Sequence, residues 1–286
     1  AGTIPVATWN SASNCNIIGV TATIPTGFAQ TFGKFIWNCG GQVRNLYMDS
    51  NITIAGNLTV WGTGSPVDPN TRSLRMSNTG TGYTITVTGN VLINFDASFK
   101  MNNSTGSCTM NVGGNFTLNS GNFTIVTGPA NSTLNVAGNV SILSGTLIMN
   151  EDNNTNTGTF NAAGNFTFSG GSINAPSGPG AINFKGSTTQ IYSKTGGTTI
   201  TGTINFAVIN GSVLDVGTSL IDGSNGTFTL NAGAGIITAH VQGLSTTANT
   251  GSIRVTGAKT FNTGADYTYD GTVAQVTGNG LPNPIH

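Results

Sequence analysis

A nine-residue pattern recurs five times between Asn51 and Phe168 and constrains the fold more than any other feature of the sequence. Each copy carries apolar residues at every second position on both sides of a Gly-Asn pair. The pairs are Gly56-Asn57, Gly89-Asn90, Gly114-Asn115, Gly138-Asn139 and Gly164-Asn165, so successive glycines are 33, 25, 24 and 26 residues apart. A repeat of this length is typical of a solenoid.

The alternation within each copy predicts two half-buried strands that meet at the Gly-Asn pair. Glycine lacks a Cβ and asparagine tolerates left-handed backbone angles, so this pair is expected to let the chain bend sharply between the strands. The inward positions then form four apolar columns along the solenoid. The first of these columns contains Ile52, Ile85, Met110, Leu134 and Phe160.

A third strand is predicted in each coil at Asn122–Ile125, Gly145–Ile148 and Gly171–Ile173. Three short strands in about 24–26 residues predict an all-β fold, a parallel β-helix. The uneven coil lengths and the absence of a hexapeptide repeat favour the right-handed form, as does the usual hand of parallel crossovers.

The chain falls into three sections. Residues 1–48 lack the Gly-Asn pair and are expected to form atypical, cap-like coils, whereas residues 49–180 hold the regular repeat. In residues 181–286 the segment Phe184–Ile191 matches Tyr269–Val276, which gives a longer repeat of 269 minus 184, or 85 residues. The second copy of this superunit is expected to be truncated at the C-terminus.

The composition excludes several partner classes. Nine Lys and Arg residues against nine Asp and Glu give no net charge, so no field exists to gather nucleic acid or anionic lipid. The sequence contains no run of about 20 apolar residues, so it predicts no membrane span. The chain begins at Ala1 without a signal segment, as expected of a processed or excised chain.

Cys15 and Cys39 are 24 residues apart, about one coil, so they are expected to stack on neighbouring strands. Their Cα atoms would then lie about 4.8 Å apart, within the range of a disulfide. A disulfide and a pair of stacked thiols both fit this spacing. Cys108 has no cysteine at coil spacing and is expected to be an unpaired, half-buried thiol.

Two segments resemble repeat units of very large cell-surface proteins of Bacteroidetes. The first is Gln275–Pro282, preceded by Thr263–Tyr269; the second joins Trp9–Cys15 with Gln30–Cys39. Proteins of this family are repetitive β-solenoids, commonly exported by the type IX secretion system, that act as adhesins or surface filaments. The resemblance implies a secreted, extracellular protein, although the family's C-terminal sorting domain is not visible in these residues.

The outward positions are the candidate binding surface. One column holds Asn51 followed by Thr84, Thr109, Thr133 and Thr159, and a second begins with Thr53 and Thr86 and continues with asparagines. A structural hydrogen-bonded ladder is the first interpretation; an ice-binding or polysaccharide-binding face is the alternative. Asn57, Asn115, Asn139 and Asn165 also begin Asn-x-Thr/Ser sequons, which the repeat generates by default.

Catalysis is not predicted. Polysaccharide lyases and hydrolases need clustered carboxylates, whereas the nine acidic residues are scattered along the sequence. Glu151 and Asp152 are expected in a solvated, projecting loop, with a calcium site as the alternative, and a second projecting loop is expected at 64–70. His240 lacks a recognisable nucleophile and is expected to be a strand residue.

These observations predict a non-enzymatic stalk or adhesin segment of an extracellular surface protein, without a cofactor. The expected partners are further repeats of the same protein or other copies placed end to end, and surface polysaccharide. The alternative is a carbohydrate-active or carbohydrate-binding β-helix.

Overall fold

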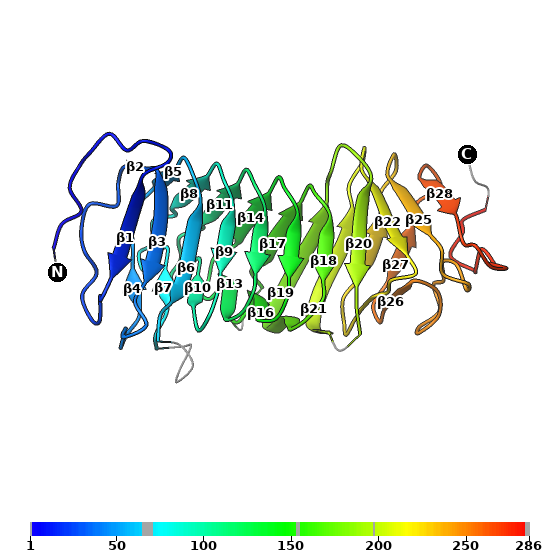
Figure 1. Cartoon of the computed structure of the whole chain (residues 1–286). Coiled ribbons are helices and arrows are strands. Elements are labelled where there is room, and N and C mark those ends of the chain that lie inside the picture. Colours follow the sequence, from blue (N-terminus) through cyan, green and yellow to red (C-terminus); the bar gives the residue numbers. More distant parts are fainter. Residues whose placement is uncertain (1, 65–70, 153–154, 197, 284–286) are drawn as a thin grey trace.

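The computed structural model describes residues 2–64, 71–152, 155–196 and 198–283. All the regular structure in this part of the chain is β, and the strands stack into one elongated rod with the two termini at opposite ends (Figure 1). All pairings between its strands are parallel. The predicted parallel β-helix is therefore confirmed.

One sheet, here called the front sheet, runs the length of the rod with its strands in chain order (Figure 1). Its strands are β1 (Asn14–Ile18), β3 (Lys34–Asn38), β6 (Leu58–Gly62), β9 (Val91–Ile93), β12 (Phe116–Leu118), β15 (Val140–Ile142), β18 (Phe166–Phe168), β20 (Gln190–Lys194), β22 (Val213–Gly217), β25 (Gly235–Thr238) and β28 (Asp266–Tyr269). Each strand pairs with the strand of the next coil.

The back sheet holds the strands that precede the front strands. It contains β2 (Thr31–Phe32), β5 (Ile52–Ile54), β8 (Thr84–Val87), β11 (Thr109–Val112), β14 (Ser132–Val136), β17 (Gly158–Ala162), the second halves of β19 (Ser172–Phe184) and β21 (Thr199–Val208), then β24 (Phe228–Leu230) and β27 (Lys259–Phe261).

The lower sheet holds the third strand of each coil. It contains β4 (Leu46–Tyr47), β7 (Leu74–Arg75), β10 (Ser98–Lys100), β13 (Asn122–Val126), β16 (Thr146–Asn150) and the first halves of β19 and β21; β23 (Ile221–Gly223) pairs with β26 (Ile253–Val255). The predicted third strand is thus confirmed. In β19 it continues without a break into the back strand, because the 13 residues pair first with β16 and then with β17.

The register reproduces the sequence repeat. Met110 pairs with Ile85 on one side and with Leu134 on the other, and Phe116 pairs with Val91 and Val140. In Figure 1 the chain descends through the front sheet and returns upward behind it as it advances from the N-terminus, which is a right-handed coil. The sheets continue from β1 to β28, across the boundaries at 48 and 180, so the described parts of the three sequence sections form one body.

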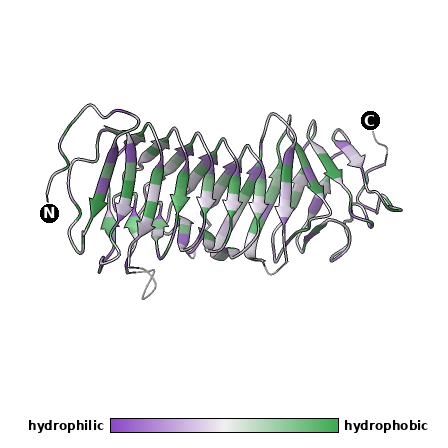
Figure 2. Cartoon of the chain, in the orientation of Figure 1, coloured by the Kyte–Doolittle hydropathy of each residue, from purple (hydrophilic) through white to green (hydrophobic). Residues whose placement is uncertain are grey.

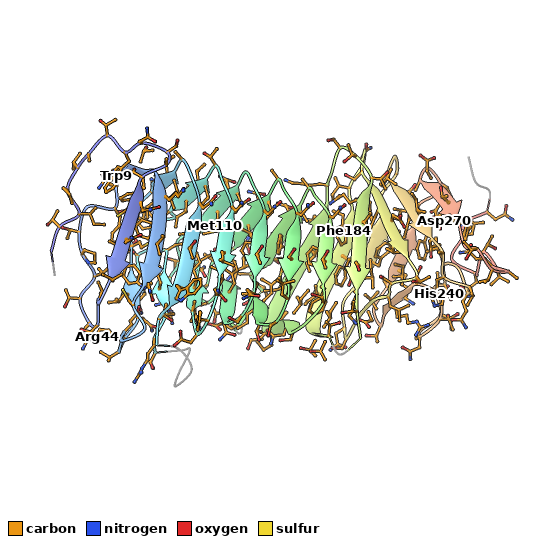
Figure 3. All side chains as sticks on the ribbon, in the orientation of Figure 1. Trp9, Arg44, Met110, Phe184, His240 and Asp270 are labelled. Atoms are coloured by element: carbon orange, nitrogen blue, oxygen red, sulfur yellow. The ribbon has the colours of Figure 1, made fainter. Side chains whose placement is uncertain are left out.

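The four predicted apolar columns form the core. All their members are buried, and hydrophobic and hydrophilic bands alternate along the strands (Figure 2). Aromatic rings pack against one another inside the coils, for example Phe116 with Phe123 and Phe160 at centroid distances of 5.0 and 5.9 Å. Met110 and Phe184 lie between the sheets in this core (Figure 3).

The 85-residue superunit has a structural counterpart in two glutamines. Gln190 Oε1 accepts a hydrogen bond from Gly186 N at 2.7 Å, and its Nε2 donates to the carbonyl oxygens of Ala162 and Gly164. Gln275 repeats this arrangement with Gly271 N and with the carbonyl oxygens of Thr238 and His240. The repeated sequence therefore encodes the same clamp between neighbouring coils.

Candidate functional site

The Gly-Asn corners are tightly stacked rather than unusually bent. The corner residues do not have positive φ values, so the expectation of left-handed backbone is wrong. A Cβ on Gly114 would lie 2.4 Å from Asn90 Oδ1 and 2.8 Å from the carbonyl carbon of Gly89. Glycine is required here because the preceding corner, Gly89-Asn90, approaches too closely for a side chain.

The corner asparagines form a hydrogen-bonded ladder along one edge of the rod. Each side-chain oxygen accepts the backbone N–H of the asparagine in the next coil, over distances of 2.8–3.0 Å. The chain of bonds runs through Asn57, Asn90, Asn115, Asn139 and Asn165, and ends at Ile191 N. These asparagines therefore join successive coils at the point where the backbone changes sheet.

The predicted outward columns lie on the back sheet. Thr84, Thr109, Thr133 and Thr159 are register partners in sequence, and so are Thr53 and Thr86. Beyond Thr86 the second column becomes an asparagine ladder in which each amide nitrogen donates to the preceding amide oxygen at 2.8–2.9 Å. Its members are Asn111, Asn135, Asn161 and Asn183. The amides satisfy one another, as the structural interpretation expects.

Beside the asparagine ladder runs an open groove of about 440 Å³. The residues that line it include the small Gly113, Ala137 and Ala163, together with Thr86 and Lys185. The change from threonine to asparagine interrupts the regular hydroxyl array that an ice-binding face needs. The column of Thr84, Thr109, Thr133 and Thr159 stays uniform, so only the second column departs from a regular threonine array.

The predicted stacking of the first two cysteines is wrong. Cys15 pairs with Phe35, because only 20 residues separate strand partners in this first coil, as in the pair Asn14 and Lys34. Cys15, Cys39 and Cys108 are all free and buried, and the Cys39 thiol donates to Ile17 O at 3.5 Å. Burial raises the pKa of each thiol, which suppresses the reactive thiolate.

Glu151 does not lie free in a solvated loop. Its Oε1 is 2.5 Å from Lys100 Nζ, and the lysine side chain is only 2% exposed. Arg75 precedes Lys100 in the same column of the lower sheet and is also buried, with its Nε donating to Ser73 Oγ at 2.7 Å. Burial lowers the pKa of Arg75. Residues 65–70 and 153–154 of the two expected loops lie outside the described residues.

His240 lies after β25 rather than within a strand, so that expectation is wrong. Its Nε2 is 3.3 Å from Arg254, and burial together with this cation lowers the pKa of the imidazole. With Asp270 it lines a hollow of about 320 Å³ at the C-terminal end of the rod (Figure 3). The other residues that line this hollow are Thr218, Ala239, Val241, Thr272 and Val273.

An exposed aromatic pair was not anticipated from the sequence. Trp61, at the end of β6, and Phe95, just after β9, have ring centroids 4.9 Å apart. Both rings reach solvent. The alternation of apolar and polar residues places Trp61 at an outward position, because it follows the inward Val60. The next two coils have Asn94 and Asn119 at this position.

The described residues contain no group of three or more His, Cys, Asp or Glu side chains that could hold a metal ion. They also contain no helix long and apolar enough to cross a membrane. Comparisons of the chain with protein-family models, with curated proteins and with solved structures give no match.

Proposed function

We propose that the chain is a non-enzymatic stalk or adhesin segment of a large extracellular surface protein. The observation that carries this proposal is the continuous front sheet, in which eleven strands from β1 to β28 pair in chain order. At about 4.8 Å per strand the sheet spans on the order of 50 Å. A rigid body of this shape holds two points apart.

Hydrogen bonds between asparagine side chains add to the backbone hydrogen bonds that join the coils of the rod. The corner asparagines bond successive coils at one edge, and the asparagines of the back sheet do so on an outward face. Tension along the rod is thus shared among three sheets and two side-chain ladders. The neutral surface, with nine basic and nine acidic residues in the whole chain, limits nonspecific electrostatic adhesion.

The resemblance noted in the sequence favours cell-surface repeat proteins of Bacteroidetes and export by type IX secretion. Within the described residues β28 pairs only with β25, which leaves its other edge open. An open edge is a template for pairing with another strand. We propose that further repeats of the same protein, or another copy, cover it.

Whole-cell immunolabelling tests this proposal. An antibody raised against the chain should label intact cells of the source organism, and external protease should remove the label while leaving a cytoplasmic marker protein intact. Immunoblots before protease treatment should show the epitope in a longer polypeptide. Label that appears only after lysis, or an epitope confined to a short cytoplasmic protein, would overturn the proposal.

A further inference from the structure

Trp61 and Phe95 form an exposed aromatic surface at the ends of two neighbouring front strands, β6 and β9. The two rings are tilted by 40° with centroids 4.9 Å apart, and the residues are 37% and 60% exposed. In the column of Trp61 the following coils hold Asn94, Asn119, Leu143 and Ser169, none of which is aromatic. Burying each ring inside the rod would have been favourable, so their shared exposure requires an explanation.

The backbone of Phe95 supplies a second, independent observation. Its φ is +50°, in the left-handed region that bulky side chains rarely adopt. Neighbouring side chains hold this conformation: Asn94 Oδ1 accepts the N–H of Phe95 at 2.9 Å, and Ser120 Oγ donates to its carbonyl oxygen at 2.9 Å. Glycine would fit this turn without strain. The position nevertheless holds phenylalanine, which places an aromatic ring beside Trp61.

Polar groups border the two rings. Asp96 follows Phe95, and its Oδ1 lies 2.9 Å from the position of a Cβ on Gly62, the residue after Trp61. Among the described residues no hydrogen-bond donor reaches the Asp96 carboxylate. Asn119 Nδ2 donates to Asn94 Oδ1 at 2.8 Å, which fixes the amide that holds the Phe95 turn. The Asp96 side chain therefore lies close to the residue that follows Trp61, and among the described residues its carboxylate is a free acceptor.

We propose that Trp61, Phe95 and Asp96 form a binding site for a neutral polysaccharide. A pyranose ring has C–H groups on its faces, which are attracted to the negative faces of aromatic rings, and hydroxyl groups around its edge, which donate to a carboxylate. The tilt between the rings suits a chain whose successive sugars are rotated relative to one another. This site goes beyond the proposed stalk, which requires no ligand.

The same features disfavour the other ligands that stack on aromatic rings. A nucleic acid would bring phosphates to Asp96 in a chain without net charge, so the electrostatic attraction that drives such binding is missing. A stable protein partner buries about 800 Å² on each side, whereas two partly exposed rings offer at most a few hundred. An extended glycan needs only a contact of that smaller size.

Affinity electrophoresis of the whole chain tests the site. Native gels would contain one of five neutral polysaccharides: hydroxyethyl cellulose, xyloglucan, galactomannan, dextran or a soluble β-1,3-glucan. At least one should retard the wild-type protein, and the dissociation constant should rise about tenfold or more in Trp61→Ala and in Phe95→Gly. Asp96→Asn should weaken binding less, because the amide oxygen still accepts a hydrogen bond.

Two controls separate binding from folding. Leu143→Ala removes another exposed apolar side chain, 42% exposed, and should leave the retardation unchanged. Phe95→Gly relieves the left-handed strain, so its melting temperature should equal or exceed that of the wild type while binding is lost. Trp61 fluorescence, measured in a Trp9→Phe background where the remaining Trp37 is fully buried, should be protected from acrylamide by the retarding glycan.

Retardation by none of the five polysaccharides would overturn the inference, as would binding that survives both aromatic substitutions. Self-association that Trp61→Ala abolishes would assign the patch to a protein contact and overturn it equally. None of these outcomes depends on surface labelling of cells. The glycan site and the stalk can therefore fail separately.

Discussion

Lys100 and Glu151 form an ion pair between residues 51 positions apart, with Nζ and Oε1 separated by 2.5 Å. The coils bring them together, because Lys100 in β10 pairs with Thr124 in β13, which pairs with Ile148 in β16. Glu151 follows the end of β16. The pair thus spans two coil steps on the lower sheet and ties a loop to the rod.

Removing the carboxylate of this pair should destabilise the rod. Glu151→Gln replaces the carboxylate beside the nearly buried ammonium of Lys100 with a neutral amide, and we expect a loss of about 2–4 kcal/mol in the free energy of unfolding. Urea denaturation followed by circular dichroism measures it. The double variant Lys100→Met/Glu151→Gln should recover most of the loss, because the buried ammonium of Lys100 is then absent as well.

The pair between Lys194 and Asp222 is the matched control. Its Nζ and Oδ2 are 2.8 Å apart, but the two side chains are 11% and 35% exposed. Asp222→Asn should therefore cost less than about 1 kcal/mol. Equal losses at Glu151 and Asp222 would show that burial does not govern the strength of these pairs.

A second prediction concerns the stability of variants at the corner glycines. Gly114→Ala would place a Cβ 2.4 Å from Asn90 Oδ1 and against the backbone of Gly89, and the stacked coils cannot separate without breaking ladder bonds. We expect a loss of about 1–3 kcal/mol, as for other overpacked sites. Gly40→Ala is the control, since nothing lies within 4 Å of its Cβ position. Thermal melts of both variants should differ clearly; equal melting temperatures would contradict close corner stacking.

The sequence was sufficient for the fold because strand alternation and a near-constant period leave one register. A shift of one residue would have turned Phe116 and Val140 outward and Thr117 and Ser141 inward. The reason for the corner glycine lies elsewhere than in its backbone angles. Backbone angles can be argued from residue type, but the distance between corners depends on how the coils stack.

The candidate site was less accessible from sequence, because it depends on coil lengths and on contacts between distant residues. Cys15 and Cys39 were assigned to one column from a 24-residue period, but the first coil is shorter and puts Cys15 beside Phe35. Glu151 was expected in solvent because its partner lies 51 residues away. Trp61 could have been identified as an apolar residue at an outward position, but its neighbour Phe95 lies in a turn whose geometry the repeat does not predict.

Tyr192 provides the third prediction, since its hydroxyl is buried without a hydrogen-bond partner among the described residues. The ring stacks on Phe166 with centroids 5.9 Å apart. Tyr192→Phe keeps that contact and removes the unsatisfied oxygen, so we expect about 1 kcal/mol more stability. Tyr267→Phe is the control, because its hydroxyl donates to Asn262 O at 2.6 Å and its loss should cost about 0.5–1.5 kcal/mol.

The same residue should govern part of the alkaline unfolding. Burial, followed by the nearby Asp222 charge, raises the pKa of Tyr192, whereas a tyrosine in the unfolded chain titrates near pH ~10. A group whose pKa is higher in the folded state stabilises the fold fully below the unfolded pKa, and this stabilisation is lost as the pH rises above it. Between about pH 9 and 11.5 the wild type should lose stability more steeply than Tyr192→Phe in urea titrations. The buried thiols contribute equally to both proteins, so parallel curves would place the Tyr192 hydroxyl in contact with water.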